Sequence, residues 1–122
     1  MDNNPSTNGE LYKKMKSLIE EITGEPGHQV VCGKFEGEGW LMYHYVCSTY
    51  DGMYPRVSIK QQKNAVHFYV MLWIAGKPIL ERYAYLFPKS AMGKGCLRLK
   101  KLSSETEQVL REVVQLAMLY NK

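Results

Sequence analysis

The sequence predicts an α+β fold: a mostly antiparallel five-stranded sheet with helices packed on one face, in the order α-β-β-β-β-α-β-α. Three observations lead to this prediction. Apolar residues recur at helical spacing near both ends of the chain, a block rich in β-branched and aromatic residues lies between them, and the turns in that block are short enough for antiparallel hairpins. A length of 122 residues suits one domain covering residues 1–122, of which 1–7 are expected to be disordered.

Three helices are expected. The first lies near residues 8–22, and the second near 77–87, where Pro78 suits a first helical turn and Pro88 ends the segment. The third begins near Ser104, because Ser104 and Glu107 can form a capping box. The apolar faces of the first and third helices are Leu11, Met15, Leu18, Ile19 and Ile22, and Val109, Val113, Leu116, Ala117 and Tyr120.

Strands are predicted near residues 29–35, 39–47, 55–62, 65–74 and 95–101. Lys63-Asn64 is the tightest turn, since Asn tolerates positive φ. A two-residue turn at this point fixes the register of the two strands that it joins. It places Lys60 opposite His67, Ser58 opposite Tyr69 and Arg56 opposite Met71, with Val57, Ile59, Phe68 and Val70 on the buried face.

Composition excludes several classes of protein. A hydrophobic fraction of 45% and a charged fraction of 23% are ordinary for a globular domain. The longest apolar stretches, such as Phe68 to Ala75, are too short to span a membrane. The polar N-terminus lacks the apolar region of a secretory signal, so we expect a cytoplasmic protein. Its three cysteines, Cys32, Cys47 and Cys96, are expected to be free thiols.

Charge is polarised along the chain. Residues 1–51 hold eight Asp and Glu against four Lys and Arg, for −4, whereas residues 52–122 hold four against twelve, for +8. The second half therefore predicts a surface that attracts anions.

The predicted register gathers basic and aromatic side chains on the sheet face opposite the buried one. We call this set the basic face; it comprises Arg56, Lys60, His67, Tyr69 and Trp73, with Arg98 and Lys100 joining if the fifth strand lies nearby. Such a surface can hold an anion or stack nucleic-acid bases, although exposed strands also carry these residues merely as a solvated face. The RNP1 pattern of RNA-recognition sheets is absent, which weakens the nucleic-acid hypothesis.

Three other patterns carry weaker chemical signals. Gly93-Lys94-Gly95 lacks the spacing of a nucleotide-binding P-loop, but Lys94 can still meet a smaller anion. His44 and Cys47 form only half of a zinc motif and fall on opposite faces of one strand. Cys96, near Lys94 and Arg98, is a weak candidate nucleophile because no catalytic base is apparent.

The second half of the chain resembles the YdhG-like family of small bacterial domains of unknown function. The resemblance is carried by Val57 to Asn64 through Phe68-Tyr69, then by Gly93 to Leu102 and a terminal helix. It implies an α+β fold and a bacterial cytoplasmic setting. Some members are described as frataxin-like, delivering iron for iron–sulfur cluster assembly. On that alternative the iron-facing residues, chosen by chemistry, are Glu20, Glu21, Glu25, Glu36 and Glu38.

The leading hypothesis is a non-catalytic binding module without a cofactor, which holds an anionic small ligand or an acidic protein partner. The binding residues are predicted to be the basic face and the segment from Lys94 to Lys101. An iron chaperone is the alternative, and iron enters only there. Neither a membrane nor a catalytic residue is expected, nucleic acid is a weaker partner, and a homodimer is left open.

Overall fold

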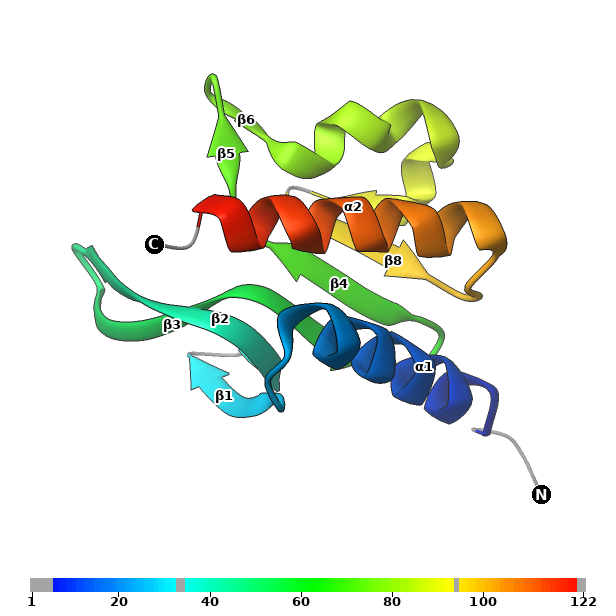
Figure 1. Ribbon diagram of the computed structural model, residues 1–122, viewed down its shortest axis with the longest axis horizontal. Helices are drawn as coiled ribbons and strands as arrows, with labels where there is room; N and C mark the ends of the chain where they lie inside the picture. The colour runs from blue at the N-terminus through cyan, green and yellow to red at the C-terminus, as the bar shows by residue number, and fades with distance from the viewer. Residues whose placement is uncertain (1–5, 33–34, 94, 121–122) are drawn as a thin grey trace.

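The computed structural model describes residues 6–32, 35–93 and 95–120. Helices α1 (Ser6–Thr23) and α2 (Ser104–Tyr120) lie on the same face of one antiparallel sheet, and they contact each other as well as the strands (Figure 1). The predicted α+β class, with the N- and C-terminal helices packed on a sheet, is confirmed. Helix α1 begins at Ser6, and residues 1–5 of the segment expected to be disordered lie outside the described residues.

The main sheet has six strands, in the spatial order β1-β2-β3-β4-β8-β7. Their bounds are β1 His28–Cys32, β2 Phe35–Cys47, β3 Tyr50–Gln61, β4 Val66–Val70, β7 Met92–Gly93 and β8 Cys96–Leu99. The prediction of five strands is therefore one short. The additional edge strand, β7, has only two residues and pairs with β8 through Met92 and Gly93, so it carries no periodicity that a sequence pattern can detect.

The strand predicted over residues 65–74 divides in two. Strand β4 ends at Val70, and a separate hairpin follows, formed by β5 (Trp73–Ile74) and β6 (Lys77–Pro78). Its two turn residues, Ala75 and Gly76, have φ of 55° and 80°. Two consecutive positive φ angles are typical of a type I′ turn, which Asn-Gly usually signals and Ala-Gly does not. Pro78 consequently lies in a strand and not in a helix.

The helix predicted over residues 77–87 is a 3-10 helix, η1, spanning Ile79–Leu86. Pro88 disfavours helical backbone at Phe87, which is extended with φ −131° and ψ 150°. A second short 3-10 segment, η2 (Lys89–Ala91), leads into β7. The chain from Ile79 to Ala91 thus forms a tight connection beside the end of the sheet.

The core lies between the sheet and the two long helices. Val57, Ile59, Phe68 and Val70 are all fully buried, which confirms the predicted inward face of β3 and β4. Helix α1 buries Leu11, Met15, Leu18 and Ile19 as expected, with Ile22 partly buried. Helix α2 buries Val109, Val113 and Ala117 as expected, and Leu110 and Val114 in addition. Leu116 is only partly buried and Tyr120 is 54% exposed, so the prediction that Tyr120 belongs to the buried face is wrong. Burial of such side chains supplies most of the free energy of folding.

Helix α2 is capped one residue earlier than predicted. The backbone N–H of Thr106 donates to Ser103 Oγ at 3.1 Å, and the backbone N–H of Glu107 donates to the Ser103 carbonyl at 2.8 Å. Ser103 is therefore the N-cap, and Ser104 is the first helical residue.

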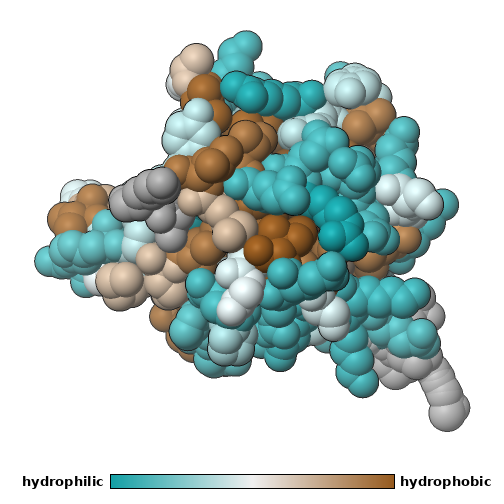
Figure 2. All heavy atoms as spheres, viewed as in Figure 1, coloured by the Kyte–Doolittle hydropathy of each residue, from teal (hydrophilic) through white to brown (hydrophobic). Residues whose placement is uncertain are grey.

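Hydrophobic atoms on the helix-bearing side of the molecule gather along the C-terminal part of α2 and on the β2–β3 hairpin (Figure 2). Exposed large apolar residues in these segments include Val46, Met53, Met118, Leu119 and Tyr120. In the described part of the chain, no helix combines the length and hydropathy needed to cross a bilayer.

Candidate functional site

The residues of the basic face are brought together by the pairing of β3 with β4, whose register is the one that the Lys63-Asn64 turn predicts. Lys60 lies opposite His67 and Ser58 opposite Tyr69, as expected, while the Met71 backbone N–H donates to the Arg56 carbonyl at 2.7 Å. Strand β8 extends the same face on the other side of β4, because Arg98 lies opposite His67 and Cys96 lies opposite Tyr69. The conditional prediction that Arg98 joins this face is therefore correct.

His67 lies between two basic side chains, Lys60 on β3 and Arg98 on β8. Its ring contacts Tyr69, with 3.3 Å between Nδ1 and the tyrosine hydroxyl. Burial, and then the positive charges of Arg98 and Lys60, hold the pKa of His67 below its usual value. Both effects favour the neutral imidazole, which can donate or accept a hydrogen bond without adding charge.

A groove with a volume of about 690 Å³ lies at this end of the sheet. Three segments distant in sequence form it: the β3–β4 turn, the connection from Phe87 to Ala91, and the end of β8 continuing to Lys101 and Thr106. Its charged lining comprises Lys63, Arg98, Lys100 and Lys101, joined by His67, and none of the described lining residues is Asp or Glu. Positive charge in a concave site concentrates anions.

Arg98 is fixed across the groove by the segment that precedes β8. Its Nη1 donates to the carbonyl oxygens of Ser90 and Met92, at 3.2 and 3.3 Å. Gly93 permits this arrangement, since a Cβ there would lie 3.1 Å from Nη2 of Arg98. The guanidinium is therefore held in place while its side chain stays exposed.

Four of the predicted ligand residues lie outside the groove. Arg56 stacks over the Tyr43 ring at 3.9 Å from its centroid, and its Nη1 donates to the Met71 carbonyl at 2.7 Å. Tyr69 lies two residues further along β4 than His67, opposite Ser58, and does not line the groove. Lys60 pairs with His67 across the strands but also does not line the groove. Trp73 lies on β5, outside the main sheet. Lys94 falls outside the described residues.

Arg56 adjoins a cluster of four tyrosines on the β2–β3 hairpin. The rings of Tyr43, Tyr45, Tyr50 and Tyr54 pack with centroid distances from 5.8 to 6.4 Å. Edge-to-face and tilted pairs of this kind stabilise each other. They give the projecting hairpin a small aromatic core of its own.

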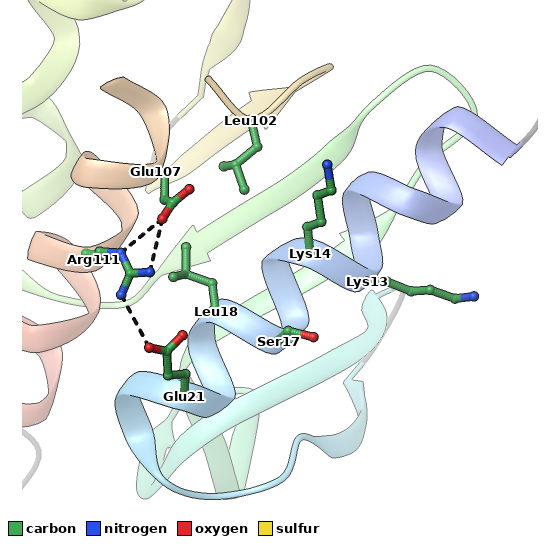
Figure 3. A pocket seen from close by; sticks show the side chains of 8 residues that line it. All are labelled: Lys13, Lys14, Ser17, Leu18, Glu21, Leu102, Glu107 and Arg111. Carbon is green, nitrogen blue, oxygen red and sulfur yellow. Dashed lines mark hydrogen bonds and ion pairs between the residues drawn. The ribbon is translucent and has the colours of Figure 1, made fainter. Parts of the chain in front are cut away.

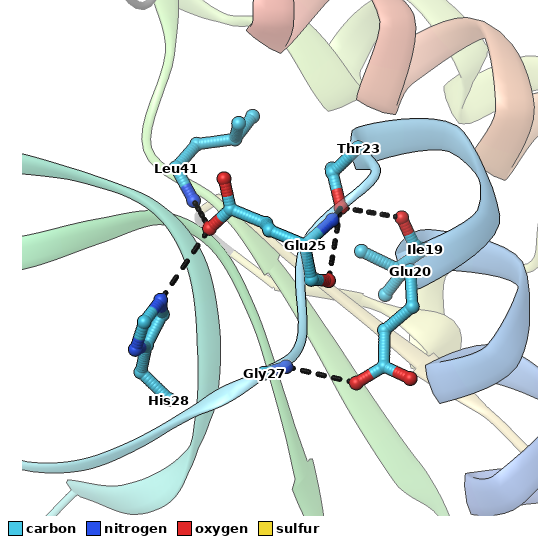
Figure 4. Close-up of polar contacts among 7 residues, drawn as sticks. All are labelled: Ile19, Glu20, Thr23, Glu25, Gly27, His28 and Leu41. Carbon is cyan, nitrogen blue, oxygen red and sulfur yellow. Dashed lines mark hydrogen bonds and ion pairs between the residues drawn. The ribbon is translucent and has the colours of Figure 1, made fainter.

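The predicted iron-facing glutamates mostly form structural contacts. The Glu20 carboxylate accepts from the Gly27 backbone N–H at 2.8 Å, and that of Glu25 accepts from the Leu41 N–H at 3.3 Å while lying 3.5 Å from His28 (Figure 4). Leu41 has a φ of 58°, and its N–H is directed to this carboxylate. These bonds hold the loop after α1 against β1 and β2.

The other glutamates are dispersed. Glu38 accepts hydrogen bonds from the Tyr12 hydroxyl and from Lys16 Nζ, the latter at 2.9 Å, and Glu36 is exposed on the same strand. Glu21 faces Arg111 of α2. Among the described residues, no group of three or more His, Cys, Asp and Glu is placed to hold a metal ion. The iron-chaperone hypothesis stays a prediction.

A second hollow lies between α1 and α2, with a volume of about 340 Å³. Arg111 occupies one side, with Nη1 3.8 Å from Glu21 and Nη2 3.0 Å from Glu107 (Figure 3). Lys13 and Lys14 line the other side. Because carboxylates already neutralise Arg111, this hollow offers an anion less attraction than the groove does.

The cysteine hypothesis is not supported by the surroundings of Cys96. Burial raises the pKa of this thiol, although Arg98 and Tyr69 act in the opposite direction, so the thiolate is not stabilised overall. Cys47 is exposed, and its Sγ lies 3.5 Å from the Thr49 hydroxyl. Both cysteines are free, as predicted.

Among the groove residues, the sequence pointed to His67, Arg98 and Lys100, and to Lys101 within the Lys94 to Lys101 segment, but missed Lys63 and the segment from Phe87 to Ala91. The run Arg98 to Lys101 was a usable signal, because three of its four residues are basic. Comparisons with protein-family models, curated proteins and solved structures gave no match.

Proposed function

We propose that this protein is a non-catalytic binding module that holds an anionic ligand in the groove at the end of the sheet. The observation that carries the proposal is the lining: four basic side chains and His67 line one concavity, with no Asp or Glu among the described lining residues. Charge-assisted hydrogen bonds from lysine and arginine are the strongest contacts that proteins offer to phosphate or carboxylate.

The position of the groove narrows the earlier prediction. The sequence favoured the whole basic face, whereas the groove uses three of its members, His67, Arg98 and Lys100, together with Lys63 and Lys101. Arg56 is engaged by the Tyr43 ring and the Met71 carbonyl, which supports a structural role for it. The YdhG-like resemblance and the cytoplasmic setting belong to the same proposal, and the antiparallel α+β architecture agrees with what the resemblance implies.

Calorimetric titration with inorganic pyrophosphate tests the proposal. The double variant Lys100→Ala/Lys101→Ala removes two exposed cations of the groove and is expected to weaken binding at least tenfold. Lys13→Ala/Lys14→Ala is the matched control, because it removes the same formal charge from exposed positions on α1. Affinity is also expected to fall as salt concentration rises.

Backbone NMR shifts locate the site in the same experiment. Pyrophosphate is expected to shift the amides of Ala65, Ala91 and Leu99, which line the groove. Equal loss of affinity in the two double variants would mean that net charge alone attracts the anion, and the proposal would be wrong. Titration with ferrous iron that shifts residues 20–38 instead would favour the chaperone alternative.

A further inference from the structure

The groove has an apolar wall that a simple anion does not use. Phe87, Pro88 and Ala91 line part of it, joined by Ala65, which precedes β4, and by Leu99 of β8. Phe87 and Ala91 are only partly buried, and both pack against the hydrophobic core from the groove side. A ligand consisting of charge alone would leave this surface in contact with water.

The wall has a fixed backbone. The N–H of Phe87 donates to the Ala84 carbonyl at 3.2 Å, and the N–H of Ala91 donates to the Pro88 carbonyl at 2.9 Å. Pro88 has a restrained φ of −68°. Arg98 ties the same segment to β8 through the Ser90 and Met92 carbonyls. The cationic wall and the apolar wall are therefore held at a set separation.

The dimensions of the groove favour a ligand larger than a single anionic group. A volume of about 690 Å³ falls in the range of about 300–1,000 Å³ typical of sites for organic small molecules. Flat aromatic groups pack well against phenylalanine, and phosphate groups pair with lysine and arginine. Both types of surface line the same space.

Building on the proposed anion-binding function, we infer that the groove takes a phosphate ester of mononucleotide size. Its phosphates lie among Arg98, Lys100 and Lys101, and its planar ring lies against Phe87 and Pro88. The side chains of Gln62 and Asn64 at the β3–β4 turn provide amide groups at the groove margin, where they can meet polar edges of the ring.

Titration of the full chain with ADP, inorganic pyrophosphate and adenosine separates the contributions of the two walls. ADP is expected to bind at least tenfold more tightly than pyrophosphate, and adenosine more weakly than either. Phe87→Leu keeps an apolar side chain but removes the ring, so it is expected to weaken ADP binding several-fold more than it weakens pyrophosphate binding. Pro88→Ala, at an exposed position, is a second variant with the same expected pattern.

The control variants distinguish this inference from the function on which it rests. Lys100→Ala/Lys101→Ala is expected to weaken both ADP and pyrophosphate, and Lys13→Ala/Lys14→Ala neither. Pyrophosphate and ADP binding equally would leave the anion-binding proposal standing and overturn the nucleotide inference. Binding of neither would overturn both. An eight-nucleotide single strand binding more than tenfold tighter than ADP would replace the mononucleotide with a nucleic acid.

Discussion

Replacing Glu38 with glutamine is expected to destabilise the fold by about 2 kcal/mol. The carboxylate is 16% exposed and joins β2 to α1 by accepting from the Tyr12 hydroxyl and Lys16 Nζ. A hydrogen bond to a charged group contributes about 1.5–3 kcal/mol, against about 0.5–1.5 for a neutral one. Losing the ion pair with Lys16, which is 39% exposed, adds at most about 1 kcal/mol.

Urea denaturation at pH 7 measures this loss. With a slope of about 1–3 kcal/mol per molar urea for small proteins, the unfolding midpoint of Glu38→Gln is expected to fall by roughly 1 M. Glu36→Gln is the matched control, because Glu36 is exposed on the same strand. A double-mutant cycle with Tyr12→Phe isolates the coupling between the tyrosine and the carboxylate.

The destabilisation also depends on pH. Burial raises the pKa of Glu38, but the hydrogen bonds from Tyr12 and Lys16 and the charge of Lys16 outweigh it and hold this pKa below its ordinary value. A carboxyl with a lowered native pKa stabilises the fold above its unfolded pKa of about 4.3 and loses that contribution as pH falls through the native value. The difference between Glu38→Gln and the parent should therefore shrink below about pH 4. A Glu38→Gln loss within about 0.5 kcal/mol of that for Glu36→Gln would refute the reasoning.

Three further predictions concern other contacts. Gly39→Ala should destabilise the protein by about 1–3 kcal/mol in urea denaturation, because the new Cβ would lie 2.4 Å from the Cβ of Pro55. Gly9→Ala should instead stabilise α1 by up to about 1 kcal/mol, because nothing lies within 4 Å of a Cβ at that position. Equal effects of the two substitutions would contradict the packing argument. Ser103→Ala should cost about 1 kcal/mol in thermal unfolding and Ser104→Ala less, and the reverse order would restore Ser104 as the cap. Iodoacetamide at pH 7.5 should modify Cys47 before Cys96, as followed by peptide mass spectrometry. The reason is that burial raises the pKa of the Cys96 thiol, whereas hydrogen bonding from Thr49 lowers the pKa of the Cys47 thiol. Faster reaction at Cys96 would contradict this expectation.

Local patterns predicted the sheet centre well, for a physical reason. Between Val57 and Val70 apolar residues recur at every second position on each side of a two-residue turn, at Val57 and Ile59 and at Val66, Phe68 and Val70, so side-chain direction and register follow from one turn. The same logic failed after Val70, because Ala75 takes a positive φ that its residue type does not signal. The 3-10 helix at Ile79–Leu86 has the apolar spacing of an α-helix, and spacing alone does not separate the two.

The candidate groove was only partly predictable. Lys100 and His67 were found because they lie on strands or directly after one, where alternation gives direction. Lys63 and Phe87 reach the same space from a turn and from an irregular connection, and their proximity depends on how those segments pack. No pattern within either segment encodes that packing.

The two edges of the sheet differ in a way that bears on self-association. Strand β7 offers only two residues to an incoming chain, too few to template a pairing. Strand β1 offers five, and its Val31 is 67% exposed. Among the described strands of the main sheet, β1 is therefore the edge at which a second copy can extend the sheet, and a charged residue in place of Val31 would guard it against such growth.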